Sequence, residues 1–554
     1  MAPSAHAGED EMKRTAIDSN TINGTWTVLL AVVVAALIGG GCTSSPCEEG
    51  TFSGSGTLYV AASCGSDSGD GSKESPLATI GAAIKNASAG DKIRVAAGTY
   101  EEALSLTSAV ALLGEGSGKT VIKPSTGAIA IQAVKANLTV SGIGIVGGGP
   151  VGILVQDGEF DATDVLIEDV RRTKTPEGKL IGGHGIQVSN TAKATMRDIG
   201  VVGCSGAGVL AASVGNVSIV APFFQEDPAS SARAGGKAGI VAPFFDEAGS
   251  KKIAGNRLGG IAIVAPFFSP NPGKTDDPKG IVAPFFHSGG VNVSGNYSFG
   301  VALFGASAKI EASAITDTIH PTSTDFADGV VVAGGGANTE VAIAKSTVVS
   351  GNQRAGMLIA AGEKTDAKVG IDGDISLNAV GGVWAHGSST AVAVGDSARL
   401  HANRVAGLVA VNKAHAVIGA ATIDRTVRRQ YGLTLGDASN IGDAVGFFEG
   451  ATGSLKNTKL VENGRAGIVI DNPGKAKSGA VDVVATGVEV TGGGYGIVVN
   501  KGSGDVEALK DKTAVSVGGK VGTAFKTDAA FDVRHSPCDP KDGKADCKPP
   551  APST

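Results

Sequence analysis

The stretch Gly152-Ile153-Leu154-Val155-Gln156, in which a glycine opens a short apolar run, decides the fold because its opening pair recurs along the chain. Successive glycine-aliphatic pairs lie 20–35 residues apart. Repetition with a loosely kept period is typical of a stacked solenoid. The fourteen pairs are Gly152-Ile153, Gly185-Ile186, Gly208-Val209, Gly239-Ile240, Gly260-Ile261, Gly280-Ile281, Gly300-Val301, Gly329-Val330, Gly356-Met357, Gly382-Val383, Gly407-Leu408, Gly432-Leu433, Gly467-Ile468 and Gly496-Ile497.

The apolar runs that follow these glycines predict strands, because they are short, rich in Val and Ile, and separated by Gly, Asn, Asp and Ser. A period of this length with two or three short strands suits one coil of a parallel β-helix. An Asn stands four residues before five of the glycines and tolerates the left-handed conformation of a tight bend. We therefore expect a column of turn residues stacked from coil to coil, made of Asn256, Asn296, Asn352, Asn403 and Asn463.

The composition agrees with thin coils and excludes some functions. The chain has 554 residues, 84 of them Gly, and only 4% aromatic residues. A solenoid reaches this length by adding coils to one domain, and we expect about fourteen or more. The net charge of −6 does not indicate nucleic-acid binding. The sequence contains no zinc-type pairing of Cys and His and no glycine loop of the phosphate-binding kind.

The N-terminus predicts export. An apolar core at 25–38 follows the basic pair Lys13-Arg14 and is shorter than the ~20 residues of a membrane-spanning helix. Gly39-Gly40-Gly41-Cys42 comes next and resembles a bacterial lipoprotein signal. The resemblance implies a lipid on Cys42, which would anchor the protein to the outer membrane or cell surface. Gly39 stands where such signals usually carry Leu, so secretion without an anchor is the alternative.

We predict five segments along the chain. They are a signal peptide (1–41), a lipid-anchored tether (42–56), an N-terminal cap with the first coil (57–105), the parallel β-helix coils (106–535) and a disordered tail (536–554). Within the cap, Ser75 and Pro76 predict the start of a helix that ends by Gly90 and covers the open end of the stack. Order begins at the strand 58–60, and 92–96 is the first alternating strand.

The cysteines fit an oxidising compartment. Cys538 and Cys547 are predicted to close a short loop near the C-terminus, and Cys47 with Cys64 is a second candidate pair. Cys204 lies within a coil and is predicted to be a buried free thiol.

The cap also carries a resemblance to a known family. The matching residues resemble the opening module of bacterial right-handed parallel β-helix proteins of the pectate-lyase-like superfamily, a module often described as a domain of unknown function. The resemblance covers about 45 residues and implies the fold, without catalytic residues. The residues that carry it, in order, are Tyr59-Val60-Ala61, Gly65-Ser66-Asp67, Gly71-Ser72, Pro76-Leu77-Ala78-Thr79-Ile80, Ala83-Ile84, Ala89-Gly90-Asp91, Ile93, Val95 and Gly98-Thr99-Tyr100.

The hexapeptide Ile-Val-Ala-Pro-Phe-Phe occurs four times, at 219–224, 240–245, 263–268 and 281–286. The offsets are close to one coil, so we expect the copies to stack, with each proline at a bend or strand end. One interpretation is an internal aromatic stack, and the other is an exposed stripe for a partner protein or a membrane surface. The stripe would contain Phe223, Phe224, Phe244, Phe245, Phe267, Phe268, Phe285 and Phe286.

Two sets of charged residues are candidates for ligand binding or catalysis. A row of arginines beside the Asn turns, Arg257, Arg354, Arg404 and Arg465, could pair with the carboxylates of an acidic polysaccharide. The second set is a charged stretch whose residue types fit the calcium ligands and proton-abstracting bases of lyases in the resembled superfamily. Its candidates are Asp157, Asp161, Asp164, Arg171, Arg172 and His184. In both sets the alternative is solvated turn side chains.

The sequence therefore predicts an all-β fold, a right-handed parallel β-helix with an N-terminal capping helix. The leading hypothesis for its function is that it serves as a non-enzymatic, adhesin-like scaffold of the cell envelope. Such a scaffold would bind a polysaccharide or a surface protein and would need no cofactor. The alternative is a lyase or hydrolase of acidic glycans that would use calcium. The pair Trp384 and His386 is the one candidate for an aromatic sugar platform, and Trp384 could equally belong to the core.

Overall fold

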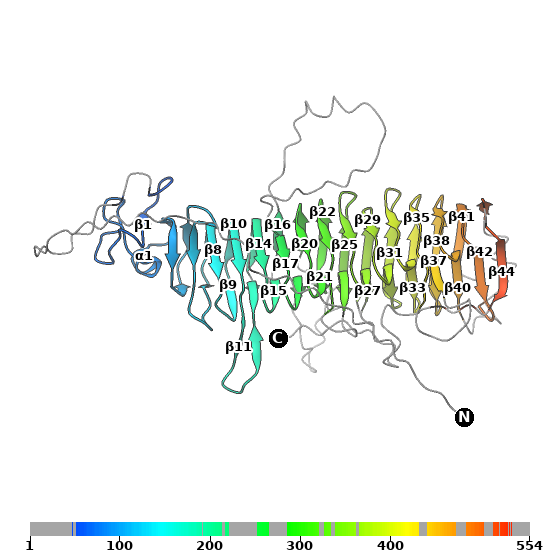
Figure 1. The fold of residues 1–554 in the computed structure, drawn as a ribbon, viewed down its shortest axis with the longest axis horizontal. Helices are drawn as coiled ribbons and strands as arrows, with labels where there is room; N and C mark the ends of the chain where they lie inside the picture. Colours follow the sequence, from blue (N-terminus) through cyan, green and yellow to red (C-terminus); the bar gives the residue numbers. More distant parts are fainter. Residues whose placement is uncertain are drawn as a thin grey trace, which may run out of the picture. The chain divides into compact units, whose positions relative to one another are not determined.

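The computed structural model is nearly all parallel strand and confirms the right-handed parallel β-helix. The coils follow one another from β1 to β44 in Figure 1. The structure describes residues 47, 51–190, 192–212, 216–220, 252–264, 285–320, 326–333, 338–361, 365–430, 440–472, 483–503, 514–519, 521–529, 531 and 533.

Most coils contribute three strands, and in the others one long strand covers the first two faces. Strands at the same place in successive coils pair in parallel to make three faces. In one coil these are β28 (Ala367–Ile371), β29 (Asp374–Ser376) and β30 (Gly381–His386). The first and second faces are joined into a 26-stranded sheet, because several strands run through both of them, and the third face is a 16-stranded sheet.

The first face contains β1 (Leu58–Val60), β2 (Asp91–Val95), β5 (Val110–Leu113), β8 (Leu138–Val146), β10 (Glu159–Glu168), β14 (Lys193–Val202), β16 (Asn216–Val220), β19 (Phe285–Gly289), β22 (Ser307–Glu311), β25 (Thr339–Ile343), β28, β31 (Thr390–Val394), β34 (His415–Ile418), β38 (Thr452–Lys456) and β41 (Val483–Thr491). The second face contains β3 (Gly98–Tyr100), β6 (Thr120–Ile122), β17 (Lys252–Ala254), β20 (Asn292–Ser294), β23 (Ala314–Thr316), β26 (Val348–Ser350), β29, β32 (Arg399–His401), β35 (Thr422–Asp424), β39 (Lys459–Val461) and β43 (Ala514–Gly518), together with the ends of β8, β10, β14 and β41. The third face contains β4 (Leu104–Leu106), β7 (Ile131–Val134), β9 (Val151–Gln156), β13 (His184–Ser189), β15 (Ala207–Ala212), β18 (Gly259–Val264), β21 (Ser298–Phe304), β24 (Ala327–Ala333), β27 (Ala355–Ala360), β30, β33 (Val405–Val411), β37 (Asn440–Phe448), β40 (Ala466–Asp471), β42 (Tyr495–Asn500) and β44 (Thr523–Ala529), with β36 (Arg429–Gln430) paired to β37.

The recurring glycines form a column on the third face, where neighbouring coils approach each other closely. A Cβ placed on Gly329 would lie 2.8 Å from the carbonyl oxygen of Gly356 in the next coil, and one on Gly356 would lie 2.8 Å from that of Gly382. The aliphatic residue after each glycine points into the core, as Val330 and Met357 do at 0% exposure. The sequence signature therefore marks a close approach between coils.

Three of the fourteen pairs lie outside the strands that the structure describes. β15 pairs directly with β18, β18 with β21, and β33 with β37. Gly239-Ile240, Gly280-Ile281 and Gly432-Leu433 fall between these paired strands and lie outside the described residues. In β37 the place of the column glycine is taken by Ala444, because Val445 pairs with Leu408.

The predicted Asn column is present, but the expectation that its Asn residues adopt the left-handed conformation was wrong. Each side chain bonds to the neighbouring coil, as where Asn352 Nδ2 donates to Asn378 Oδ1 at 2.8 Å and Asn378 Nδ2 donates to Asn403 Oδ1 at 2.9 Å. Asn378 extends the column at the same four-residue offset from Gly382. The left-handed conformation belongs to the residue before each predicted Asn: Gly255, Gly295, Gly351, Ala402 and Glu462. The buried amides satisfy the backbone at the bend.

The N-terminal helix α1 (Ile80–Asn86) is shorter than predicted and starts later. Thr79 is its N-cap, and its hydroxyl accepts from Ala82 N. The backbone N–H groups of Ile80 and Gly81 donate to the Glu102 carboxylate at 2.9 and 2.8 Å. The predicted start at Ser75 and Pro76 was wrong, because the chain there extends so that Leu77 can bridge Val60 of β1 (Leu58–Val60).

The cysteine predictions have separate outcomes. Cys47 and Cys64 form a disulfide with a Cα–Cα distance of 5.4 Å. Cys204 is a buried free thiol, as predicted, and burial raises its pKa to about 11. Cys42, Cys538 and Cys547 lie outside the described residues. Within the described part of the chain, no helix has the length and apolar character needed to cross a membrane.

The hexapeptide copies do not stack where the structure describes them. The first copy ends β16, where Ile219 pairs with Ser288 rather than with another copy. Ile263 of the third copy lies in β18 on the third face. The backbone of Phe285 and Phe286 starts β19 on the first face, and the six other phenylalanines lie outside the described residues. The stacking prediction was wrong because the offsets do not follow the coil: residues 221–251 and 265–284 interrupt a single coil that runs from β16 to β19.

Candidate functional site

The charged stretch predicted from sequence does not come together as one group. Asp157 accepts from Asn190 Nδ2 at 3.0 Å, and Asp164 accepts from the backbone and hydroxyl of Ser117 at 3.2 and 2.9 Å. Arg171 pairs at 2.8 Å with Asp169, and both side chains are more than half exposed. Asp161 is exposed on β10, and Arg172 lies on the strand β11 (Arg172–Lys174), which leaves the stack.

No cation cage is formed by these residues. In the ranges that the structure describes, no three His, Cys, Asp or Glu side chains are grouped so that they could hold a metal. Calcium binding by an enzyme therefore stays a prediction from resemblance.

His184 is a buried structural residue at the start of β13. Only 6% of it is exposed, and its Nδ1 accepts from the backbone N–H of Ala207 at 3.0 Å. Burial, followed by the charge of Arg172, lowers its pKa to about 4. The ring is therefore neutral over the physiological pH range and does not serve as a proton donor there.

His184 should give the protein a measurable pH dependence. Its pKa is about 6.5 in the unfolded chain and about 4 in the folded chain, so the unfolded chain binds more protons between these values. Stability is unaffected above pH 6.5 and should fall by about 1 kcal/mol per pH unit as the pH drops towards 4. Urea unfolding of the wild type and of His184→Gln across this range measures the difference. Parallel curves for the two proteins would contradict the assignment.

The four arginines predicted as one row separate into two kinds. Arg354 and Arg465, each two residues after its Asn, have side chains 6% and 4% exposed. Each donates through Nε and Nη2 to a buried carboxylate of the preceding coil, Asp328 and Asp443 respectively. Successive residues of an extended chain point to opposite sides. Arg257 and Arg404, which directly follow their Asn, are accordingly exposed. The prediction that these four arginines form a single row was therefore wrong.

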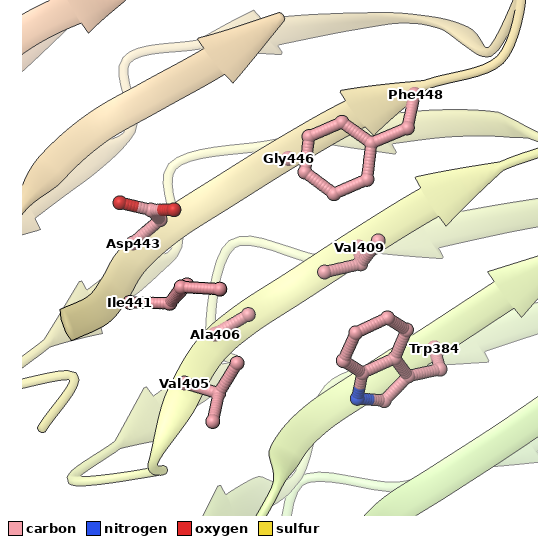
Figure 2. Close-up of a pocket in the computed structure, with 8 residues that line it drawn as sticks. All are labelled: Trp384, Val405, Ala406, Val409, Ile441, Asp443, Gly446 and Phe448. Atoms are coloured by element: carbon pink, nitrogen blue, oxygen red, sulfur yellow. The ribbon is translucent and has the colours of Figure 1, made fainter. Parts of the chain in front are cut away.

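Trp384 is buried on the outer side of the third face and is not an exposed sugar platform. It is 1% exposed and lies in an apolar cluster with Leu358, Val409 and Phe448. Figure 2 shows the small pocket beside it, which is also lined by Asp443. The indole Nε1 has no hydrogen-bond partner, and a Cβ on Gly381 would lie 2.1 Å from it. His386, its neighbour in sequence, is exposed.

A polar group that the sequence did not predict lies on the second face. Arg399 Nε and Nη2 each donate to the Asp424 carboxylate at 3.1 Å, and His401 Nδ1 lies 2.8 Å from Asp424 Oδ2. Asp424 is 5% exposed, whereas the Arg399 and His401 side chains are 35% and 23% exposed. Although burial raises the pKa of Asp424, the bonds from Arg399 and His401 outweigh it and lower the pKa.

Three further arginines follow this group in the same two coils, which lie in register. β32 pairs with β35, so that His401 stands opposite Asp424, and Arg404 bridges Val427 just beyond. This register places the exposed Arg404 opposite Val427, which lies between Arg425 and Arg428 in the sequence; both of these arginines are also exposed. Arg425 pairs at 3.3 Å with Glu462 of the next coil. We call this surface the polar corner; it consists of Arg399, His401, Arg404, Asp424, Arg425 and Arg428.

Exposed apolar side chains border the polar corner. Leu377 is 61% exposed and has a left-handed backbone with φ of 58°, while Val427 is 46% exposed. The backbone N–H of Leu377 donates to the carbonyl of His401 at 3.0 Å, which fixes its position. Leu377 directly precedes Asn378, so its left-handed conformation is the one that recurs before the Asn residues of the column. The polar corner thus combines cationic, hydrogen-bonding and apolar groups.

One family model matches part of this chain. Residues 63–258 match the family model described as "Protein of unknown function (DUF1565)", in agreement with the resemblance of the N-terminal module. No curated protein matches.

Three of the similar solved structures span different activities. The catalytic unit of a GH87 α-1,3-glucanase from Streptomyces thermodiastaticus is 13% identical to this chain, with a TM-score of 0.34. The match covers 86% of this chain and 71% of the glucanase chain. The periplasmic alginate epimerase AlgG is 11% identical, with a TM-score of 0.29, and covers 78% of each chain. PfbA, a surface adhesin of Streptococcus pneumoniae, is 12% identical to this chain, with a TM-score of 0.23. The match covers 80% of this chain and 86% of the PfbA chain. Values this low carry no argument about activity.

Proposed function

We propose that this protein is an exported envelope scaffold that binds an acidic polysaccharide at the polar corner. The observation that carries the proposal is the gathering of four arginines and a histidine over two adjacent coils, in a chain whose net charge is −6. Guanidinium groups match carboxylates in geometry as well as in charge. The arginine row predicted from sequence is thereby replaced by a compact group around Arg404.

The arrangement suits binding better than bond cleavage. Asp424, the most buried carboxylate of the corner, is held by both Arg399 and His401, so its negative charge is committed to positioning those two side chains. Arg404 lies at the surface, where it can meet a ligand, and Arg428 is exposed beside it in the next coil while its Nε donates to the carbonyl oxygen of Gly464. Leu377 and Val427 offer apolar area to the C–H face of a sugar ring.

Calorimetry with polygalacturonate tests the proposal, with the fully methyl-esterified polymer as the uncharged control. The substitutions Arg404→Gln, Arg425→Gln and Arg428→Gln should together weaken binding at least tenfold, because each charged contact contributes about 1 kcal/mol or more. Raising the salt concentration should weaken it further. Arg257→Gln, which changes an exposed arginine elsewhere, should have no effect. Equal binding of the charged and esterified polymers, or full binding by the triple variant, would refute the proposal.

A further inference from the structure

One hairpin, formed by residues 171–182, projects from the stack of coils, and we call it the finger. The antiparallel strands β11 and β12 (Leu180–Gly182) form a separate hairpin, which projects from the coils in Figure 1. Its root is tied to the stack, because Arg172 N donates to Ser205 Oγ at 2.7 Å and Gly206 N donates to Gly183 O at 2.7 Å. Its turn is closed by a bond of 2.8 Å from Thr175 N to Lys179 O. The finger is therefore a formed element.

The finger exposes two neighbouring aliphatic side chains. Leu180 is 52% exposed and Ile181 is 39% exposed. Successive residues of a strand point to opposite faces, so each face of the hairpin carries one of them. The register places Leu180 opposite Lys174 and Ile181 opposite Thr173. Each face thus combines apolar area with a polar or cationic neighbour.

The charge of the finger is opposite to that of the whole chain. Residues 171–182 contain four basic side chains and one acidic side chain, whereas the chain has a net charge of −6. Arg172, Lys174 and Lys179 are exposed, and the acidic residue, Glu177, lies in the turn. Such a basic element is attracted to an anionic surface over a distance set by the salt concentration.

We propose that the finger docks on an anionic lipid membrane. Leu180 and Ile181 enter the boundary between headgroups and acyl chains, and the basic side chains bind lipid phosphates with their alkyl stems along the apolar layer. A protein groove would cover one face of the hairpin and leave the other aliphatic side chain in water. A membrane interface surrounds both faces. The polar corner, more than 200 residues along the chain, has no part in this proposal.

Co-sedimentation with vesicles tests the proposal. All proteins carry Cys42→Ser, so that no attached acyl chain contributes, and vesicles of equal phosphatidylglycerol and phosphatidylcholine are compared with pure phosphatidylcholine. We expect at least tenfold tighter binding to the anionic vesicles. Leu180→Ser with Ile181→Ser, and separately Lys174→Gln with Lys179→Gln, should each reduce that binding about tenfold or more. All four side chains are exposed, and circular dichroism checks that the variants fold.

A control variant and a second ligand, polygalacturonate, distinguish membrane docking by the finger from nonspecific vesicle binding and from binding of an acidic glycan. Val417→Ser with Val484→Ser changes two aliphatic side chains of similar exposure, 41% and 38%, on the first face, and should leave vesicle binding unchanged. The polar-corner substitutions should also leave it unchanged. Anionic vesicle binding that survives both finger variants would overturn the proposal. So would finger-dependent binding of polygalacturonate without vesicle binding, which would make an acidic glycan the occupant.

Discussion

Gly329→Ala is expected to lower the free energy of unfolding by about 3 kcal/mol, because its Cβ would enter a filled space. That atom would lie 2.5 Å from Val349 Cγ1, 2.6 Å from Asn352 Nδ2 and 2.8 Å from Gly356 O. Two of these neighbours belong to the interior of the next coil and cannot move without disturbing the Asn column. Urea unfolding followed by circular dichroism measures the loss.

Gly370→Ala is the matched control for this substitution. Gly370 lies in β28, and a Cβ there would meet only Val341 O at 3.9 Å, an ordinary contact distance. Its effect should stay within about 0.5 kcal/mol. If both variants lost the same stability, the loss would come from strand propensity and not from the close approach of coils.

Arg354→Met is expected to cost about 3–5 kcal/mol, because it leaves the Asp328 carboxylate buried without its cation. Asp328 is 0% exposed, and its Oδ1 also accepts from the backbone N–H of Ala355 at 3.0 Å. The guanidinium carbon of Arg354 additionally lies 4.0 Å from the centre of the Phe326 ring. Thermal and urea unfolding of the variant measure the cost.

Two comparisons separate the buried charge from the loss of side-chain packing. Arg257→Met removes an exposed arginine beside the same Asn column and should change stability by less than about 0.5 kcal/mol. Adding Asp328→Asn to Arg354→Met should recover part of the loss, because the uncompensated charge is then gone. A double variant as unstable as the single one would show that the charge of Asp328 is not the cause.

The fold was predictable because its signature comes from sterics within each coil. A glycine such as Gly356 gives the carbonyl of the next coil room to approach, and the following aliphatic residue fills the core. Both demands recur in most coils, although β37 carries Ala444 at the glycine position, and they appear in the sequence as a repeat. The Asn column was predictable for the same reason, although the left-handed residue proved to be its neighbour, as at Gly351 before Asn352.

The polar corner was not predictable, because it depends on register between coils. Arg404 and Arg428 are 24 residues apart, and the coils differ widely in length along the third face. Only the pairing of β32 with β35 shows that the two side chains belong to one surface. Variable coil length also explains why the stacking of the hexapeptides was wrongly predicted. The copies are spaced by about one coil length in the sequence, but residues 221–251 and 265–284 come between the strands of a single coil.

Hydrogen exchange with and without polygalacturonate tests the location of the proposed site most directly. If the polymer binds at the polar corner, exchange should slow in 399–404 and 425–428 when the polymer is present, with little change in the finger at 171–182. The triple arginine variant should lose this protection while its exchange in the core strands stays the same. Protection confined to other coils, or none at polymer concentrations that saturate binding, would contradict the assignment of ligand binding to the polar corner.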